Sequence, residues 1–257
     1  MGWKHTVATR LFSRQFVQAL KNEAQVQAAR LRCLTPANRR RVRALRHARG
    51  LSLNLGAGFH TRDGWTPVDL MVDPPGGIRW DVRWGLPFDA GSARRIHCEH
   101  FIEHLRFPDE VMPALVECFR VLEPGGELRI IVPDAGRYLR AYAARDTAFF
   151  DAMRELGGAE VPFETEIEIV NQTFRMGGDH QFAWDLPVMR RRLEAAGFER
   201  VQETGYDPVR FIDQGDEWRR RESLYVVAYR PQDSPVASET APAEALAAAQ
   251  RGPAGVV

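Results

Sequence analysis

Residues that could bind a polar ligand or move a proton recur just beyond short apolar segments of this sequence of 257 residues. They are Gly56–Gly58, Asp69, Asp81, the pair Glu99–His100, and Asp134. A carboxylate accepts hydrogen bonds from hydroxyl and amino groups, and an imidazole can take up a proton near neutral pH. Each position lies at or just beyond the end of a predicted strand of a largely parallel sheet, where ligands bind at the carboxyl ends of the strands. We therefore expect the five positions to form one site.

The glycine turn at Gly56 and Gly58 favours a ligand without phosphates. Glycine lets the main chain turn sharply and lets a ligand approach backbone N–H groups. A dinucleotide fingerprint needs a third glycine where this sequence has Thr61, and Asp69 follows Gly58 by only 11 residues, too few for a full crossover helix. We expect a nucleoside, with its ribose hydroxyls on Asp69 and its adenine amino group on Asp81. A dehydrogenase with a dinucleotide cofactor is disfavoured.

The elements that must position these residues alternate between strand and helix, which predicts an α/β fold: a mostly parallel sheet with helices on both faces. Strands are expected at residues 51–55, 66–70, 78–82, 95–99, 128–132, 199–206 and 223–229. Helices are expected at residues 8–32, from Pro36 onward, and at 108–122 and 186–196, with a turn at 123–126.

This pattern divides the chain into four regions. Residues 1–50 form a basic helical extension and residues 51–230 the α/β domain. Residues 137–185 are an aromatic-rich insert that we interpret as a lid of helices and loops over the acceptor. Residues 231–257 are dominated by Pro, Ala, Ser, Gln and Gly without a core pattern, which predicts a disordered tail.

Charge is unevenly distributed although the net charge is only +1. Residues 1–50 hold 12 Lys/Arg and one acid, Glu23. The simplest interpretation is a solvated helical face that also contacts the rest of the chain, in which acidic residues exceed basic ones. The two helices are also a candidate arm for a homodimer. A non-catalytic module that binds nucleic acid through this segment is the alternative, but its arginine-rich part, residues 30–49, contains no Phe, Trp or Tyr. No apolar run suits a membrane span or a secretory signal, and three scattered cysteines suit a reducing compartment, so we expect a cytoplasmic protein.

In combination the motifs resemble the class I S-adenosylmethionine-dependent methyltransferases, and most closely the methyltransferase-11-like branch associated with glycan and natural-product pathways. The resemblance is carried by residues 53–58 with 64–69, Asp81 with 86–88, residues 99–105, and residues 119–126 with 132–134, and more weakly by 178–180 with 193–198.

The resemblance implies a Rossmann-like sheet of seven strands whose last strand is antiparallel. It implies S-adenosylmethionine as cofactor, with the amino-acid part at the Gly56–Gly58 turn, the ribose at Asp69 and the adenine at Asp81. The residues expected to bind the cofactor are Leu55, Gly56, Ala57, Gly58, Asp69, Asp81, Val82 and Glu99. Ala57 stands where a cysteine is common in this branch, and the short loop before Asp69 implies a reduced first crossover helix.

Methyl transfer to a hydroxyl requires removal of a proton, for which a histidine is suited near neutral pH. His100 and His180 are the candidate bases, and Asp134, Asp179 and Tyr138 are candidate substrate contacts. We expect His97 to point into the sheet, His104 to pack or cap a helix, and Glu103 to make a structural contact. Most aromatic residues of the insert are expected to form the core of the lid.

Three questions stay open at the level of sequence. The acceptor is a small molecule, with a sugar or glycan hydroxyl favoured and an amino sugar or other amine as the alternative. Asp134, Asp179, His100 and His180 could hold a Mg²⁺ ion, but no ligand spacing supports a metal. The number of subunits is not encoded in any motif.

Overall fold

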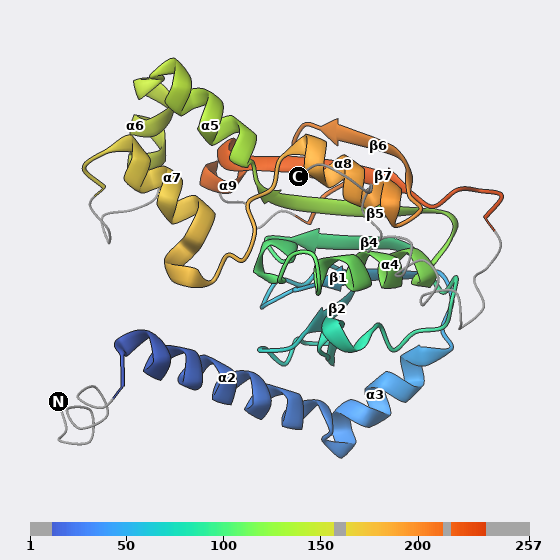
Figure 1. Cartoon of the computed structure of the whole chain (residues 1–257). Helices are drawn as coiled ribbons and strands as arrows, with labels where there is room; N and C mark the ends of the chain where they lie inside the picture. The colour runs from blue at the N-terminus through green and yellow to red at the C-terminus, as the bar shows by residue number, and fades with distance from the viewer. Residues whose placement is uncertain (1–11, 157–162, 213–216, 235–257) are drawn as a thin grey trace, which may run out of the picture.

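Seven strands form a single sheet in the computed structural model, in the order β3-β2-β1-β4-β5-β7-β6 (Figure 1). The structure describes residues 12–156, 163–212 and 217–234. Only β7 runs antiparallel to its neighbours β5 and β6. The strands are β1 (Leu51–Leu55), β2 (Thr66–Asp69), β3 (Ile78–Arg79), β4 (Ala93–Glu99), β5 (Leu122–Pro133), β6 (Glu199–Thr204) and β7 (Ser223–Tyr229). The predicted fold class, a seven-stranded mostly parallel sheet surrounded by helices, is confirmed.

The helices of the described residues surround this sheet. Their bounds are α2 (Arg14–Cys33), α3 (Pro36–Arg46), α4 (Val111–Val121), α5 (Ala135–Ala144), α6 (Thr147–Leu156), α7 (Glu166–Arg175), α8 (Leu186–Ala195) and α9 (Glu217–Glu222), with short 3₁₀ turns η1 (Val82–Trp84), η2 (Ile102–His104) and η3 (Met176–Gly178). None of these helices is both long and apolar enough to cross a bilayer.

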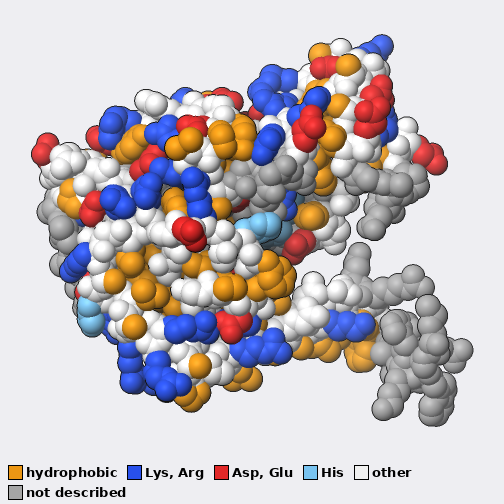
Figure 2. Space-filling model, turned by 180° about the vertical axis from the view of Figure 1, so that it is seen from behind, with side chains coloured by type: hydrophobic (Ala, Val, Ile, Leu, Met, Phe, Trp, Pro, Cys, Tyr) orange, Lys and Arg blue, Asp and Glu red, His pale blue; other side chains and the backbone are white. Residues whose placement is uncertain are grey.

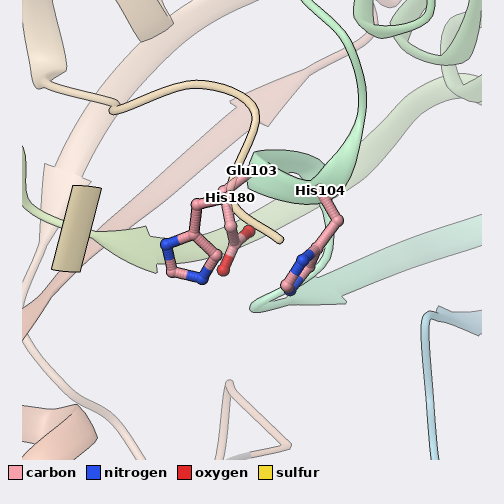
Figure 3. A group of neighbouring side chains, drawn as sticks. All are labelled: Glu103, His104 and His180. Atoms are coloured by element: carbon pink, nitrogen blue, oxygen red, sulfur yellow. The ribbon is translucent and has the colours of Figure 1, made fainter. Parts of the chain in front are cut away.

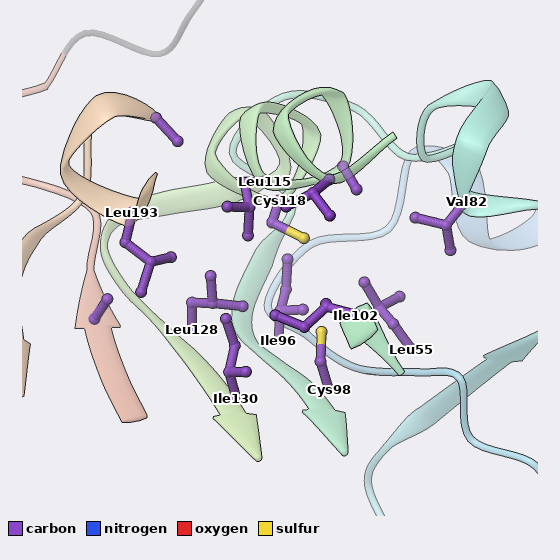
Figure 4. Packing of buried hydrophobic residues seen from close by; sticks show 14 of the residues in the cluster. Leu55, Val82, Ile96, Cys98, Ile102, Leu115, Cys118, Leu128, Ile130 and Leu193 are labelled. Atoms are coloured by element: carbon purple, nitrogen blue, oxygen red, sulfur yellow. The ribbon is translucent and has the colours of Figure 1, made fainter. Parts of the chain in front are cut away.

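The main core lies between the sheet and the helices α4 and α8 (Figure 4). Side chains alternate between the two faces of a strand, so Ile96 and Cys98 of β4 enter this core with Leu115 of α4. The alternate residues on the other face of β4, His97 and Glu99, are also buried. Packing on both sides of the central strands holds their carboxyl ends, and therefore the site, in a fixed arrangement.

Two predicted element boundaries differ from the structure for local reasons. The third strand ends at Arg79, because the Asp81 carboxylate accepts a hydrogen bond from the Arg83 amide and begins η1 instead. The predicted turn at residues 123–126 lies inside β5, where the pairing with β4 moves from Ala93–Leu122 to Arg95–Glu127. These four residues therefore bulge out of the strand.

The insert folds as the helices α5, α6 and α7, beside the carboxyl ends of β4 and β5 (Figure 1). Its aromatic and aliphatic side chains pack with one another, as expected for a lid core: Tyr138, Phe150, Met153, Ile169 and Val170 are all buried in one cluster. This part of the insert therefore has a hydrophobic core of its own.

The helix α2 lies along the opposite side of the same strand ends (Figure 1). Several contacts hold the N-terminal helices on the domain, and two of them involve buried groups. Arg30 of α2 forms an ion pair with Asp81, with 2.8 Å between Nε and Oδ2. The buried side chain of Asn38 in α3 bonds both the amide and the carbonyl of Arg79. The basic extension thus packs on the edge of the sheet.

Candidate functional site

A cavity of about 450 Å³ opens where the carboxyl ends of β1, β2 and β4 meet. This volume is within the range of pockets that bind small molecules. Its wall includes six of the predicted positions, which are Gly56, Asp69, Asp81, Val82, His100 and Asp179. Figure 2 shows histidine side chains beside acidic ones in a hollow of the molecular surface.

The glycine turn is shaped for close approach at Gly56. Its φ of +67° is a backbone conformation that favours glycine. A Cβ atom at this position would lie 2.6 Å from the ring of Phe101, so no larger residue fits without displacing that ring. The turn therefore leaves main-chain atoms, rather than a side chain, on the cavity wall.

Asp69 is held by backbone amides that leave part of its carboxylate available. Oδ2 accepts from the Gly58 amide at 2.9 Å, and Oδ1 accepts from the amides of Met71 and Val72 at 2.8 Å. A carboxylate has about four acceptor positions, so Oδ2 retains one. Its placement on the cavity wall fits the predicted contact with a ribose hydroxyl.

Asp81 lies on the same wall but is occupied by arginines. Arg83 donates to both of its oxygens, and Arg30 donates to Oδ2. Burial acts to raise the pKa of this carboxyl, yet the hydrogen bonds from Arg83 and Arg30 outweigh burial and lower the pKa. An adenine amino group could bind Asp81 only by replacing one of these donors, and this predicted contact stays a prediction.

His100 adopts a backbone conformation that is rare outside glycine, with φ of +44°. Its Nδ1 lies 3.3 Å from Oε1 of Glu103, and its Nε2 lies 3.0 Å from the Ser223 hydroxyl. Burial acts to lower the pKa of His100, but the Glu103 carboxylate outweighs it and raises the pKa. Both ring nitrogens therefore have a partner.

A second histidine cluster lies next to this pair (Figure 3). Glu103, His104 and His180 each offer one ligand-type atom, and these atoms all lie within 4.8 Å of one another. The amides of Gln181 and Phe182 donate to the Glu103 carbonyl, which brings the segment carrying His180 beside η2. Residues 76 positions apart in the sequence, 104 and 180, thus become neighbours.

His180 has a defined orientation because its Nδ1 donates to the Thr173 carbonyl at 2.6 Å. This carbonyl belongs to the last turn of α7, where helix carbonyls lack partners within the helix. Burial lowers the pKa of His180, which favours the neutral imidazole. Within the described part of the chain no hydrogen bond reaches its Nε2.

Two expectations for this region are wrong in part. His104 was expected to pack or to cap a helix, whereas it lies on the wall of the cavity with its Nδ1 3.3 Å from Oδ2 of Asp179. The reason is that the chain after β4 forms only the short turn η2, so His104 is not enclosed by a longer helix. Glu103 is buried as expected, but against histidines rather than at a helix end.

The structure does not bring Asp134 and Tyr138 to the cavity, contrary to the predicted substrate contacts. Asp134 is buried and begins α5 by accepting from the Arg137 amide. Tyr138 is fully buried and donates to Glu222 at 2.6 Å. Both side chains are used by the fold, whereas Asp179 does reach the cavity wall.

Other predicted positions lie behind the cavity wall. Leu55 and Ala57 are buried in the core. Gly58 contributes to the site through the hydrogen bond that its backbone amide donates to Asp69. Glu99 is buried between His97 and Arg219, at 3.6 Å from each. His97 is fully buried within the sheet, as predicted.

The helix α2 was predicted, but not its place at the site, where Asn22, Gln25 and Val26 line the cavity. Their types carry no functional signal, and the surrounding arginines favoured the interpretation of a solvated face. Trp80 and Arg83 were also missed. The proposed set of metal ligands differs as well, because the described residues assemble Glu103, His104 and His180 rather than Asp134, Asp179, His100 and His180.

The sheet order is the one that the resemblance to class I methyltransferases implies, and one comparison of the sequence points the same way. Residues 78–130 match a family model described as "Methyltransferase domain". No curated protein matches the chain. The match and the sheet order agree with the resemblance of the motifs to the class I S-adenosylmethionine-dependent methyltransferases.

Solved structures with related folds have low sequence identity. A methyltransferase from Mesorhizobium loti has 19% identity and a TM-score of 0.40, with 74% of this chain and 95% of that chain covered. Phosphoethanolamine N-methyltransferase 2 from Haemonchus contortus, in complex with S-adenosyl-L-methionine, has 14% identity and a TM-score of 0.43, with 76% and 52% covered. The chain therefore spans about half the length of that enzyme. Both TM-scores are below 0.5. The resemblance to methyltransferases therefore depends on the matched segment and the sheet order.

Proposed function

We propose that the protein transfers a methyl group from S-adenosylmethionine to a hydroxyl of a small molecule, with a sugar or glycan as the favoured acceptor. The observation that carries the proposal is the unpaired Nε2 of His180 beside the cofactor cavity. A histidine with one nitrogen fixed and the other available is suited to take the proton of a hydroxyl.

The residues of the wall fit the cofactor. Main-chain atoms at Gly56 can face its amino-acid part without a side chain between them, and the remaining acceptor position of Asp69 suits a ribose hydroxyl. When bound, the cofactor supplies a methyl carbon attached to a positively charged sulfur. What the chain must then provide is alignment of the acceptor oxygen with that carbon, which is largely an entropic contribution.

The two candidate bases have different roles in this proposal. His180 accepts the proton at Nε2 while the Thr173 carbonyl keeps its ring in place. His100 has partners at both nitrogens and lies between Glu103 and Ser223, so we assign it to the positioning of Glu103. The helix α2 and the helices α5 to α7 lie on opposite sides of the strand ends where the acceptor would bind (Figure 1).

Methylation of an amine is the second candidate, and buried carboxylates favour it. Glu103 and Glu222 are both nearly inaccessible to solvent and lie near His100. Such groups would stabilise an acceptor that carries an ammonium charge. A neutral amine attacks through its lone pair and loses a proton only after the methyl group has been transferred, so it needs no strong base.

Calorimetry with S-adenosylhomocysteine tests the cofactor assignment first, because binding requires no knowledge of the acceptor. A screen of nucleotide sugars, glycosides and amino sugars with labelled cofactor then identifies the acceptor. For a hydroxyl acceptor we expect His180→Ala to reduce turnover by about 100-fold or more while cofactor affinity is retained. A small effect of His180→Ala would favour an amine, and absence of binding at saturating S-adenosylhomocysteine would overturn the assignment.

A further inference from the structure

We propose that Glu103, His104 and His180 bind a divalent transition-metal ion of the zinc type at the inner end of the cofactor cavity. One carboxylate and two imidazoles have ligand-type atoms within 4.8 Å of one another, a separation that a single ion can bridge (Figure 3). Zinc is bound by histidine nitrogen and carboxylate oxygen at about 2.0–2.2 Å, so these side chains would have to move together slightly, until the ligand atoms lie about 4 Å or less apart.

Both histidines are held in the way that metal-binding histidines usually are. A ligand histidine normally donates its other ring N–H to a carbonyl or a carboxylate, which fixes the tautomer and the ring. The Nδ1 of His180 meets the Thr173 carbonyl at 2.6 Å, and the Nδ1 of His104 meets the carbonyl and Oδ2 of Asp179 at 3.3 Å. In each ring Nε2 is the nitrogen that remains for an ion.

Glu103 is the independent observation that points to a cation. Its side chain is 1% exposed, and its Oε2 has no hydrogen-bond donor among the described residues. The nearest charge partner is Nδ1 of His100, at 3.3 Å from Oε1. Burial of a carboxylate is costly unless it is paired and hydrogen-bonded. An ion between Glu103 and the two histidines would provide the missing partner.

The ligand types decide which ions fit. Magnesium and calcium prefer shells made only of oxygen, whereas imidazole nitrogen suits zinc, cobalt, nickel and iron. Three protein ligands leave at least one coordination position open, as in catalytic zinc sites. His104 lines the cofactor cavity, and Glu103 with His180 lines a smaller adjoining one, so the open position faces the region where the acceptor must bind.

The role of the ion rests on the proposed methyl transfer, although the binding site itself does not. A hydroxyl of the acceptor at the open position would have a lower pKa and would lose its proton to solvent. The oxygen then forms a bond to the methyl carbon, and the carbon–sulfur bond breaks with its electron pair kept by sulfur. His180 would in that case act as a ligand and the ion would replace it in activating the hydroxyl.

Titration with Co²⁺ tests the site without any acceptor. The full-length protein is dialysed against a chelator and titrated with CoCl₂, and the visible absorption of the ion reports nitrogen and oxygen ligation. We expect one equivalent to bind, to be displaced by Zn²⁺, and to bind at least about 100-fold more weakly in Glu103→Gln and His180→Ala. His47→Ala, which changes an exposed histidine far from the cluster, should bind as the wild type does.

Asp179→Asn provides a variant that is safe for folding, because the Asp179 side chain is 70% exposed. It removes the charge that orients His104 and should weaken Co²⁺ by about 10-fold. Absence of saturable binding in the wild type, or equal affinity in Glu103→Gln, His180→Ala and Asp179→Asn, would overturn the site. Methyl transfer that is unchanged by the chelator would overturn the role of the ion. Metal binding without methyl transfer to any acceptor would refute the proposed function, but the proposal of a metal site would stand.

Discussion

At the scale of single residues, the site depends on side chains that are held by backbone groups rather than by each other. Asp69 is fixed by three amides, and His180 by a helix carbonyl. Gly56 contributes by having no side chain at all. Each of these features can be removed by one substitution with a predictable physical effect.

We expect Gly56→Ala to weaken S-adenosylhomocysteine binding by about 10-fold or more, because each 1.4 kcal/mol corresponds to a factor of ten. The added Cβ would lie 2.6 Å from Phe101 and displace its ring into the cavity. Gly50→Ala is the matched control, since Gly50 has a similar φ of +66° but no atom within 4 Å of the added Cβ. Calorimetry should show normal affinity for Gly50→Ala, and equal affinity for both variants would contradict the clash.

Asp81→Asn should destabilise the protein at pH 7 by about 3 kcal/mol, the scale for breaking a buried ion pair. Because the pKa of Asp81 is lowered, its stabilisation is present above the ordinary pKa of 3.8 and is lost as pH falls through the lower pKa of the folded state. Urea denaturation of both proteins from pH 7 downward should therefore show a difference that shrinks below about pH 4.

The exposed pair of Asp73 with Arg41 provides the comparison for Asp81. Asp73→Asn should cost less than about 1 kcal/mol, because solvent screens surface ion pairs. A difference between wild type and Asp81→Asn that stays constant from pH 7 to pH 3 would show that the Asp81 charge does not stabilise the fold.

At the scale of secondary-structure elements, α2 completes a cavity that the α/β domain alone would leave open. It lines the wall through Asn22, Gln25 and Val26 and is tied to the domain by Arg30. The Arg30 guanidinium also lies 5.7 Å from the centre of the Trp84 ring. A single side chain thus makes two of the contacts that hold this helix.

We expect Arg30→Ala to accelerate amide hydrogen exchange across α2, because the helix loses its ion pair with Asp81. S-adenosylhomocysteine should slow exchange in α2 of the wild type, since a ligand in the cavity contacts its lining residues. Arg32→Ala, on the exposed side of α2, is the control and should exchange as the wild type does. Identical exchange in all three proteins would mean that Arg30 does not anchor the helix.

At the scale of the whole molecule, the lid is coupled to the sheet through a buried hydrogen bond. The Tyr138 hydroxyl of α5 donates to Glu222, which directly precedes β7, at 2.6 Å. Burial raises the pKa of Glu222 despite this bond. The helices α5 to α7 are therefore held in place by the contact with Glu222, just before β7, as well as by their own hydrophobic core.

Tyr138→Phe should destabilise the protein by about 1–3 kcal/mol, because Glu222 would lose a donor while remaining buried. S-adenosylhomocysteine affinity should not change, since Tyr138 does not reach the cavity wall. Tyr142→Phe, on the exposed side of α5, should be neutral in thermal denaturation. A loss of acceptor turnover in Tyr138→Phe at full stability would instead support the original prediction of a substrate contact.

The sequence alone determined the class of fold and predicted several of the residues at the strand ends that line the candidate cofactor cavity. Apolar periodicity predicted the strands closely, and β7 has the predicted bounds of residues 223–229. Asp69 and Gly56 were predicted because a parallel sheet gathers its strand ends at one edge, so their position along the chain also determines their position in space. Local sequence signals are therefore sufficient to predict the position of a candidate site residue that lies at the end of a strand.

Only the tertiary structure decided the acceptor half. His104 and His180 are brought together by hydrogen bonds from residues 181 and 182 to the Glu103 carbonyl, and no periodicity or spacing encodes that contact. Tyr138 and Asp134 have types suited to a substrate, but packing and helix capping use them elsewhere. The physical reason is that burial and long-range pairing depend on the complete packed chain, whereas strands and turns depend mainly on neighbouring residues.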